Sequence, residues 1–84
     1  IVLEKERYSA FFGTDLSAEL ARHSCDAVVI CGVMTNMCCE STARDAYYRD
    51  YRVFFLADGT GSMTEEMQMA SLLNLGRWIA VFRR

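Results

Sequence analysis

The chain has 84 residues, of which 52% are hydrophobic and 24% are charged, and its formal net charge is −2. This length allows one domain at most, and the composition is that of a globular protein rather than a disordered one. The weak acidic charge disfavours a nucleic-acid partner. The longest apolar runs, such as residues 27–31, are too short to cross a membrane, so we expect neither nucleic acid nor membrane as partner.

Strand-like and helix-like segments alternate along the first half of the chain. Ile1–Leu3 is expected to be the tail of a strand. Thr14 is a suitable N-cap for a helix over residues 15–22. Residues 27–31 form a short, continuous, β-branched run, which predicts a strand buried on both faces.

The alternation continues beyond that strand. Thr35 or Asn36 can cap a helix from about residue 37 to residue 49. Residues 52–57 predict a second buried strand, and the glycine-rich stretch 58–62 predicts a turn. These features extend the pattern of the first half.

The last part of the chain predicts one more helix and one more strand. Thr64, followed by two glutamates, starts a helix. Its apolar stripe is expected to include Met67, Ala70 and Leu73, and Leu72 could also belong to it. Residues 78–82 are expected to form the last strand. Strands that alternate with helices predict an α/β fold with a parallel sheet. Ligands of such sheets bind beyond the carboxyl ends of the strands, here residues 32–39.

The four cysteines do not suggest a disulfide framework or a metal site. Cys31 lies in a strand-like run, and Cys38 and Cys39 are adjacent, so we expect reduced thiols in a cytoplasmic protein. The chain has no CxxC pair. Its single histidine, His23, is remote in sequence from the adjacent residues Cys38 and Cys39, so we expect no zinc site.

Cys38 lies where a helix is predicted to begin, after a sharp turn that Gly32 permits. Free N–H groups and the positive end of the helix dipole favour an anion at such a position. A thiolate is such an anion, and the same N–H groups could hold an oxyanion. The alternative is that Cys38 and Cys39 are small packing residues, because cysteine is among the most buried residue types.

Lys5 is the only lysine beside eight arginines. A lysine can lose its proton when desolvated, whereas an arginine effectively cannot, so Lys5 could serve catalysis; the alternative is a solvated lysine at a strand end. The aromatic residues Tyr8 and Phe11 could belong to a pocket or to the core. A pair of cysteine and His23 is possible in principle, but a surface histidine at the end of a helix is the favoured interpretation.

Three segments in a consistent order resemble the isochorismatase-like cysteine hydrolase superfamily. They read KERYSAFFGTDL over residues 5–16, GVMTNMCCESTARDA over 32–46 and RDYRVFFLAD over 49–58. The superfamily includes nicotinamidases, N-carbamoylsarcosine amidohydrolases, ureidoacrylate amidohydrolases and isochorismatases. The double cysteine and the residues after it look most like the ureido and carbamoyl amidohydrolases.

The resemblance implies a three-layer α-β-α fold with a Rossmann-like parallel sheet, of which residues 1–84 would be the C-terminal half of a single hydrolase domain. It implies that Cys38 is the nucleophile and Lys5 its catalytic partner. It further implies an oxyanion hole from the backbone N–H groups of Met34 and Cys38, and a cis peptide between Val33 and Met34.

Tyr8 and Phe11 would line the substrate pocket, and no metal or other cofactor is implied for this half. The family's third catalytic group is an aspartate at the end of the first strand, and no segment of this chain matches it. The chain also opens inside an apolar run without a starting methionine. We therefore expect an N-terminal half or a partner chain to carry that aspartate, and we expect a homo-oligomer.

The implied sheet has the strand order 3-2-1-4-5-6, with strand 3 ending near Lys5 and strands 4, 5 and 6 later in this chain. The implied reaction is hydrolysis of a C–N bond in a small amide, ureido or carbamoyl compound through a thioester. One alternative is vinyl-ether hydrolysis of the isochorismatase type, which does not need a cysteine. Another is an inactive fragment or an interaction module.

Overall fold

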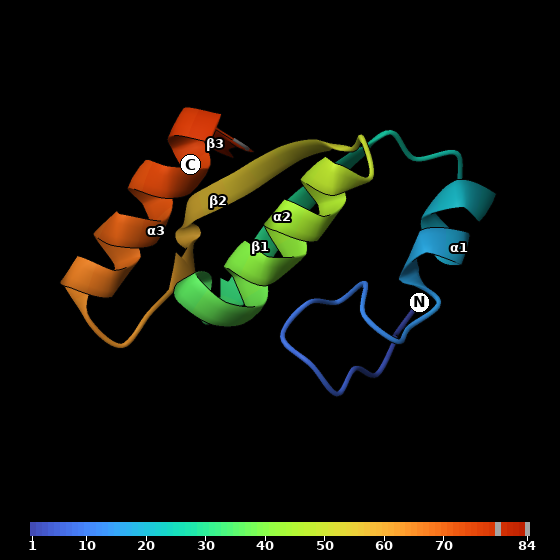
Figure 1. Ribbon diagram of the computed structural model, residues 1–84, viewed down its shortest axis with the longest axis horizontal. Coiled ribbons are helices and arrows are strands. Elements are labelled where there is room, and N and C mark those ends of the chain that lie inside the picture. Colours follow the sequence, from blue (N-terminus) through green and yellow to red (C-terminus); the bar gives the residue numbers. More distant parts are fainter. Residues whose placement is uncertain (79, 84) are drawn as a thin grey trace.

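The computed structural model describes residues 1–78 and 80–83 (Figure 1). Strands and helices alternate, and the strands form a parallel sheet, which confirms the predicted α/β class. The elements in chain order are helix α1 (Leu16–Arg22), strand β1 (Ala27–Val33), the π-helical turn η1 (Thr35–Cys39), helix α2 (Glu40–Tyr48), strand β2 (Arg52–Gly61), helix α3 (Glu65–Trp78) and strand β3 (Ala80–Arg83).

The sheet has the order β1-β2-β3. Val28 lies beside Val53 in the β1–β2 ladder, and Val53 lies beside Ala80 in the β2–β3 ladder. Within the described residues β1 pairs with β2 alone, so its second edge has no strand beside it. An unpaired edge presents N–H and C=O groups to any strand that reaches it.

Both β1 and β2 run further than the sequence predicted, because their pairing continues past a bulge. From the pair Ile30–Phe55 to the pair Gly32–Thr60, β1 advances by two residues and β2 by five, so β2 holds three extra residues. The glycine-rich stretch 58–62 was predicted to be a turn. Most of it is the bulged end of β2 instead.

Helices α2 and α3 cover one face of the sheet (Figure 1). Ala43 and Ala46 of α2 are fully buried, and their small side chains allow the helix to approach the strands closely. Phe55 of β2 and Leu75 of α3 are also fully buried between these layers. The remaining buried hydrophobic residues of this core are Phe11, Ile30, Cys39 and Val53.

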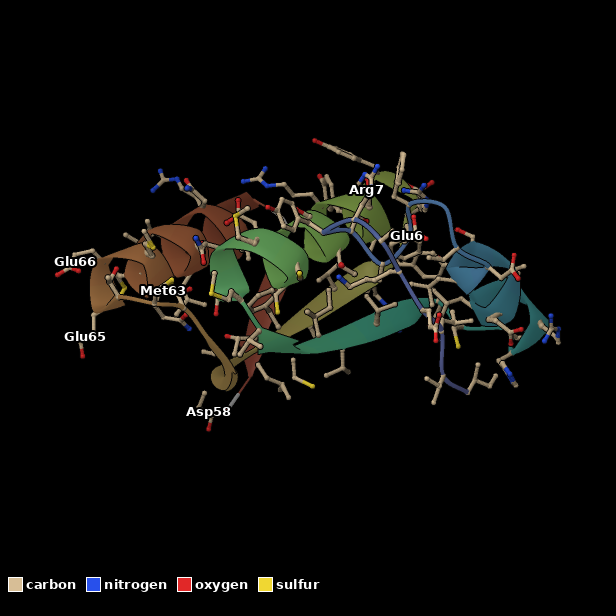
Figure 2. The ribbon with its side chains drawn as sticks, turned by 90° about the horizontal axis from the view of Figure 1, so that it is seen from below. Glu6, Arg7, Asp58, Met63, Glu65 and Glu66 are labelled. Atoms are coloured by element: carbon tan, nitrogen blue, oxygen red, sulfur yellow. The ribbon has the colours of Figure 1, made fainter. Side chains whose placement is uncertain are left out.

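The opposite face of β1 is uncovered. Val29 is 65% exposed and Val33 is 72% exposed, whereas Ile30 between them is buried. Figure 2 shows no helix on this side of the two long strands, and Glu6 and Arg7 lie on the helix side. The prediction of a strand buried on both faces is therefore wrong for the described residues, which build two of the three expected layers. None of their helices is long and apolar enough to cross a membrane.

The predicted strand tail at Ile1–Leu3 is absent. Residues 1–5 have no regular secondary structure, and Ile1 and Val2 are 84% and 93% exposed. A strand needs a neighbouring strand for its backbone hydrogen bonds, and the described sheet places none beside this segment.

Two of the three predicted helix starts are close to the observed ones. The hydroxyl oxygen of Thr14 accepts the N–H of Leu16 at 3.2 Å, and that of Thr64 accepts the N–H of Met67 at 3.1 Å. Capping by Thr35 or Asn36 is not observed, because η1 has no side-chain cap.

The predicted apolar stripe of α3 is wrong except at Leu72, which is partly buried against the core. Met67, Ala70 and Leu73 are exposed, whereas Ser71 and Leu75 are buried. The predicted last strand, 78–82, is also shifted, since α3 includes residue 78 and β3 covers Ala80–Arg83; position 79 lies outside the described residues.

Candidate active site

The candidate site begins where β1 turns into η1. Gly32 has a φ of +113°, a conformation that side chains with a Cβ rarely adopt. The peptide between Val33 and Met34 is cis, as the resemblance implied. The chain then enters η1, which brings Cys38 to the end of the strand and the beginning of the helical segment.

The backbone around Met34 is hydrogen-bonded to this helical segment. Its carbonyl accepts the N–H groups of Met37 and Cys39, both at 3.1 Å. These bonds fix the loop that carries the thiol of Cys38. The oxyanion role of the Met34 and Cys38 N–H groups stays a prediction.

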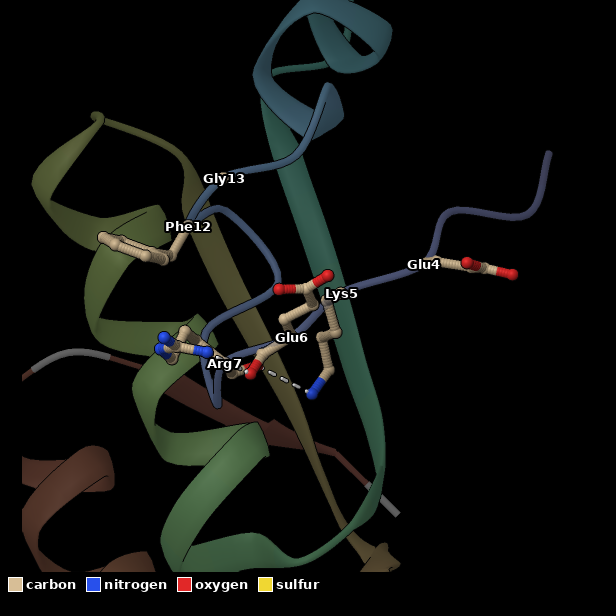
Figure 3. A pocket seen from close by; sticks show the side chains of 6 residues that line it. All are labelled: Glu4, Lys5, Glu6, Arg7, Phe12 and Gly13. Atoms are coloured by element: carbon tan, nitrogen blue, oxygen red, sulfur yellow. Dashed lines mark hydrogen bonds between the residues drawn. The ribbon is translucent and has the colours of Figure 1, made fainter.

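Lys5 and Cys38 lie together although 33 positions separate them. The Lys5 ammonium donates to Cys38 Sγ at 3.4 Å and to the carbonyl oxygen of Arg7 at 3.0 Å. The second bond is drawn in Figure 3, in which the Arg7 guanidinium points away from the Lys5 ammonium. The structure thus brings the two residues of the predicted catalytic pair into contact.

An open depression of about 480 Å³ lies beside this pair, lined by Lys5, Glu6, Arg7, Tyr8 and Cys38. Tyr8 lines this depression together with Cys38 and is 56% exposed, and its role in substrate binding stays a prediction. A second depression of about 400 Å³ (Figure 3) shares three of these residues but not Cys38; its lining is Glu4, Lys5, Glu6, Arg7, Phe12 and Gly13. The charged and aromatic lining suits a small polar ligand.

Phe11 is not brought to the thiol, in contrast to the expected contact with substrate. It is buried in the core, where its ring centroid lies 6.2 Å from that of Tyr51 and 4.8 Å from the guanidinium carbon of Arg49. The Phe11 ring is buried in the core instead of lining the pocket, and it anchors the loop that carries it. His23 lies exposed at the end of α1, with Nε2 3.8 Å from a carboxylate oxygen of Glu19, and it lines none of the depressions around Cys38.

The four thiols are all free, as the sequence predicted, but their surroundings differ. Cys25 and Cys31 are exposed, Cys38 is half-buried and Cys39 is buried. Burial raises the pKa of the Cys39 thiol, and the neighbouring Cys38 adds to that effect. Cys39 therefore stays protonated at neutral pH, which makes it a poor nucleophile.

We expect iodoacetamide at limiting amounts to alkylate Cys38 first and Cys39 last under native conditions. Cys38 is half-buried, borders an open depression and lies 3.4 Å from the Lys5 ammonium, whereas Cys39 is buried and its raised pKa keeps it protonated. Peptide mapping after a short exposure measures the order. The variant Lys5→Met should slow labelling of Cys38 and leave that of Cys25 unchanged. First labelling of Cys25 or Cys39 would show that the nucleophile is wrongly assigned.

A groove of about 300 Å³ is lined by Lys5 and Cys38 and by residues 29–33 of β1. Its lining is Lys5, Ala10, Val29, Ile30, Cys31, Gly32, Val33, Cys38, Cys39 and Thr42. Thr42 is one helical turn after Cys38, and that spacing in the sequence is the signal that it could face the site. Among the described residues, no group of three or more His, Cys, Asp and Glu side chains could hold a metal ion.

Comparison with known proteins gives consistent matches. Nicotinamidase 3 of Arabidopsis thaliana is 46% identical over 74 residues, which are 88% of this chain and 37% of that protein. A ureidoacrylate amidohydrolase of Methylobacterium radiotolerans is 40% identical over 76 residues, 89% of this chain and 30% of that protein. The chain thus spans well under half the length of these curated relatives.

A crystal structure of an isochorismatase-like hydrolase from Alkaliphilus metalliredigens superimposes with a TM-score of 0.91 at 44% identity. The match covers 95% of this chain and 45% of that one. The isochorismatase domain model matches residues 1–82. This match includes Lys5, the cis peptide and Cys38 in one continuous stretch, and the chain therefore belongs to the isochorismatase family.

Proposed function

We propose that the complete protein is a cysteine hydrolase that cleaves a C–N bond in a small amide, ureido or carbamoyl compound. The observation that carries this proposal is the Lys5 ammonium at 3.4 Å from Cys38 Sγ, beside an open depression. Two relatives named as a nicotinamidase and a ureidoacrylate amidohydrolase support a C–N bond as the target.

In the proposed first half-reaction, Cys38 loses its proton to a base and its sulfur attacks the substrate carbonyl carbon. Lys5 stabilises the thiolate, and the N–H groups of Met34 and Cys38 hold the oxyanion. The C–N bond then breaks, and the nitrogen leaves as ammonia or an amine with the proton that the thiol gave up. The acyl group remains on sulfur as a thioester.

In the second half-reaction, water attacks the thioester carbonyl after losing a proton to the same base. The C–S bond breaks, the acyl group leaves as an acid, and the proton returns to the sulfur of Cys38. No electron changes hands in either half-reaction, so the proposed cycle requires no redox cofactor.

We propose that the base belongs to polypeptide outside these 84 residues, either an N-terminal half of the same domain or a partner chain. Three observations support this. The second edge of β1 is unpaired, Val29 and Val33 are exposed, and the groove along β1 ends at Lys5 and Cys38. A strand beside β1 would bring its own residues next to the thiol.

Vinyl-ether hydrolysis of the isochorismatase type is the second candidate reaction. It makes no use of a nucleophilic thiol, whereas Cys38 has a lysine partner and an open approach. The Lys5–Cys38 contact therefore favours C–N hydrolysis.

The full-length protein should release ammonia or amine from at least one of nicotinamide, ureidoacrylate and N-carbamoylsarcosine. It should release no pyruvate from isochorismate. A coupled assay for ammonia, with product identification by mass spectrometry, measures this. Turnover of isochorismate alone would favour the second reaction, and turnover of none of the four would contradict the proposed class of substrate.

A further inference from the structure

We infer that Thr42 is a positioning residue that holds Lys5 against Cys38. The inference rests on the proposed function, in which this pair does the chemistry. Its basis is one hydrogen bond between segments that are 32 positions apart, in which the hydroxyl oxygen of Thr42 accepts the backbone N–H of Ala10 at 2.9 Å. The bond is partly buried, so water competes with it poorly.

Thr42 connects the two functional residues by a short path. It follows Cys38 by four positions on the continuous helical segment of η1 and α2, so the two side chains lie on the same side of the helix. Ala10 follows Lys5 by five positions on the loop. The helix that carries the nucleophile thus also holds the loop that carries its partner.

Few other contacts fix the position of this loop. Residues 1–15 form no helix or strand, so no backbone ladder fixes them. Phe11 is anchored by burial beneath Arg49, and the oxygen of the buried Ser9 side chain accepts the Phe11 N–H at 3.2 Å within the loop. These contacts hold the loop against Arg49 and within itself. The Thr42–Ala10 bond ties the loop backbone to the helical segment that carries Cys38, and so helps to hold the Lys5 ammonium beside the thiol.

The hydroxyl is the part of Thr42 that matters. Valine has nearly the same shape but offers no acceptor, so Thr42→Val would leave the Ala10 N–H without its partner and let the loop shift. Serine retains the acceptor. Thr42 lines the groove with Lys5 and Cys38. Within the part of the chain that the structure describes, its hydroxyl bonds to neither side chain, so it acts through the backbone of Ala10.

The test compares Thr42→Val and Thr42→Ser in the full-length protein, on the substrate of the panel above that it hydrolyses best. Thr42→Val should lower kcat by about 10-fold and leave KM within about two-fold, because misplaced groups cost rate more than binding. The rate of Cys38 alkylation by iodoacetamide should fall with kcat. Thr42→Ser should restore both rates to within about two-fold of the parent protein.

Thr64→Val is the matched control. The Thr64 hydroxyl oxygen also accepts a backbone N–H, that of Met67 at 3.1 Å, but it does so at the start of α3. This variant should keep the parent kcat and Cys38 alkylation rate. The inference is overturned if Thr42→Val keeps both rates, if Thr42→Ser fails to restore them, or if Thr64→Val lowers them equally. Failure of the proposed function looks different, because hydrolysis would then persist in Cys38→Ser. The rate of Cys38 alkylation in the Thr42 variants would still report whether Thr42 positions Lys5.

Discussion

Replacing Cys38 by serine in the full-length protein should lower kcat by about 10⁴-fold or more, the scale seen when a nucleophile is removed from a catalytic group of residues. A serine hydroxyl at neutral pH is a far weaker nucleophile than a cysteine sulfur. The depression beside Lys5 remains in place, so substrate binding should survive. Steady-state kinetics together with a binding measurement on the variant separate the two effects.

Cys25→Ser and Cys39→Ser are the controls for that experiment. Cys25 is exposed, so its replacement should change neither activity nor stability. Cys39 is 4% exposed, and its thiol contacts the Cys31 carbonyl oxygen at 3.9 Å, a distance that a shorter serine side chain does not bridge. The buried hydroxyl should therefore lower the free energy of unfolding by about 1–3 kcal/mol while the folded enzyme stays active. Activity in Cys38→Ser above one-tenth of the parent value, or its loss in Cys25→Ser, would contradict the assigned nucleophile.

The 84-residue chain alone should hydrolyse none of these substrates and should not remain monomeric. It has no base beside Cys38 in the proposed scheme, and β1 presents an unpaired edge together with exposed valine side chains. Such edges recruit other chains. Activity assays and sedimentation of the 84-residue chain, beside those of the full-length protein, test this. A monomeric, cooperatively folded and active 84-residue chain would contradict the half-domain proposal.

Lysine substitutions on the bare face of β1 sharpen this test. Val29→Lys and Val33→Lys should reduce association of the 84-residue chain, because the lysines are solvated there. In the full-length protein each should lower the free energy of unfolding by at least about 2 kcal/mol, because the same face is proposed to be buried. Tyr48→Lys, at a position of α2 that is 70% exposed, is the control and should be neutral in both proteins.

The strands β1 and β2 were the most predictable strands of the fold. Residues 27–31 and 53–57 are continuous apolar runs, and such runs are typical of parallel strands. The helix starts at Thr14 and Thr64 were predictable because a threonine can accept the first free N–H groups of a helix.

The predictions of secondary structure and burial were wrong where tertiary contacts decide the outcome. The residues of Ile1–Leu3 read as a strand, but a strand forms only beside a partner. In α3, Met67 and Leu73 are more apolar than Ser71, yet the helix buries Ser71, whose hydroxyl donates to a carboxylate oxygen of Glu40 at 2.7 Å. A hydrophobicity pattern cannot anticipate such a cross-helix bond.

Some residues of the candidate site could also be predicted from the sequence, and others could not. The motifs around Lys5 and Cys38 predicted the residue pair, because the resemblance covers both segments. Phe11 was misplaced because an aromatic residue near a lysine motif suits a pocket and a core equally well. The bond between Thr42 and Ala10 could not be predicted, since nothing in the sequence shows which helix turn meets which loop residue.

Trapping the acyl-enzyme tests the proposed chemistry most directly. The full-length protein is mixed with a hydrolysable amide or carbamoyl substrate, quenched in acid within the first turnovers, digested and analysed by mass spectrometry. We predict a substrate-derived acyl adduct on the peptide that carries Cys38, which hydroxylamine removes as it removes thioesters and which is absent from Cys38→Ser. Turnover without any adduct on Cys38, or with the adduct on Cys25, Cys31 or Cys39, would contradict it.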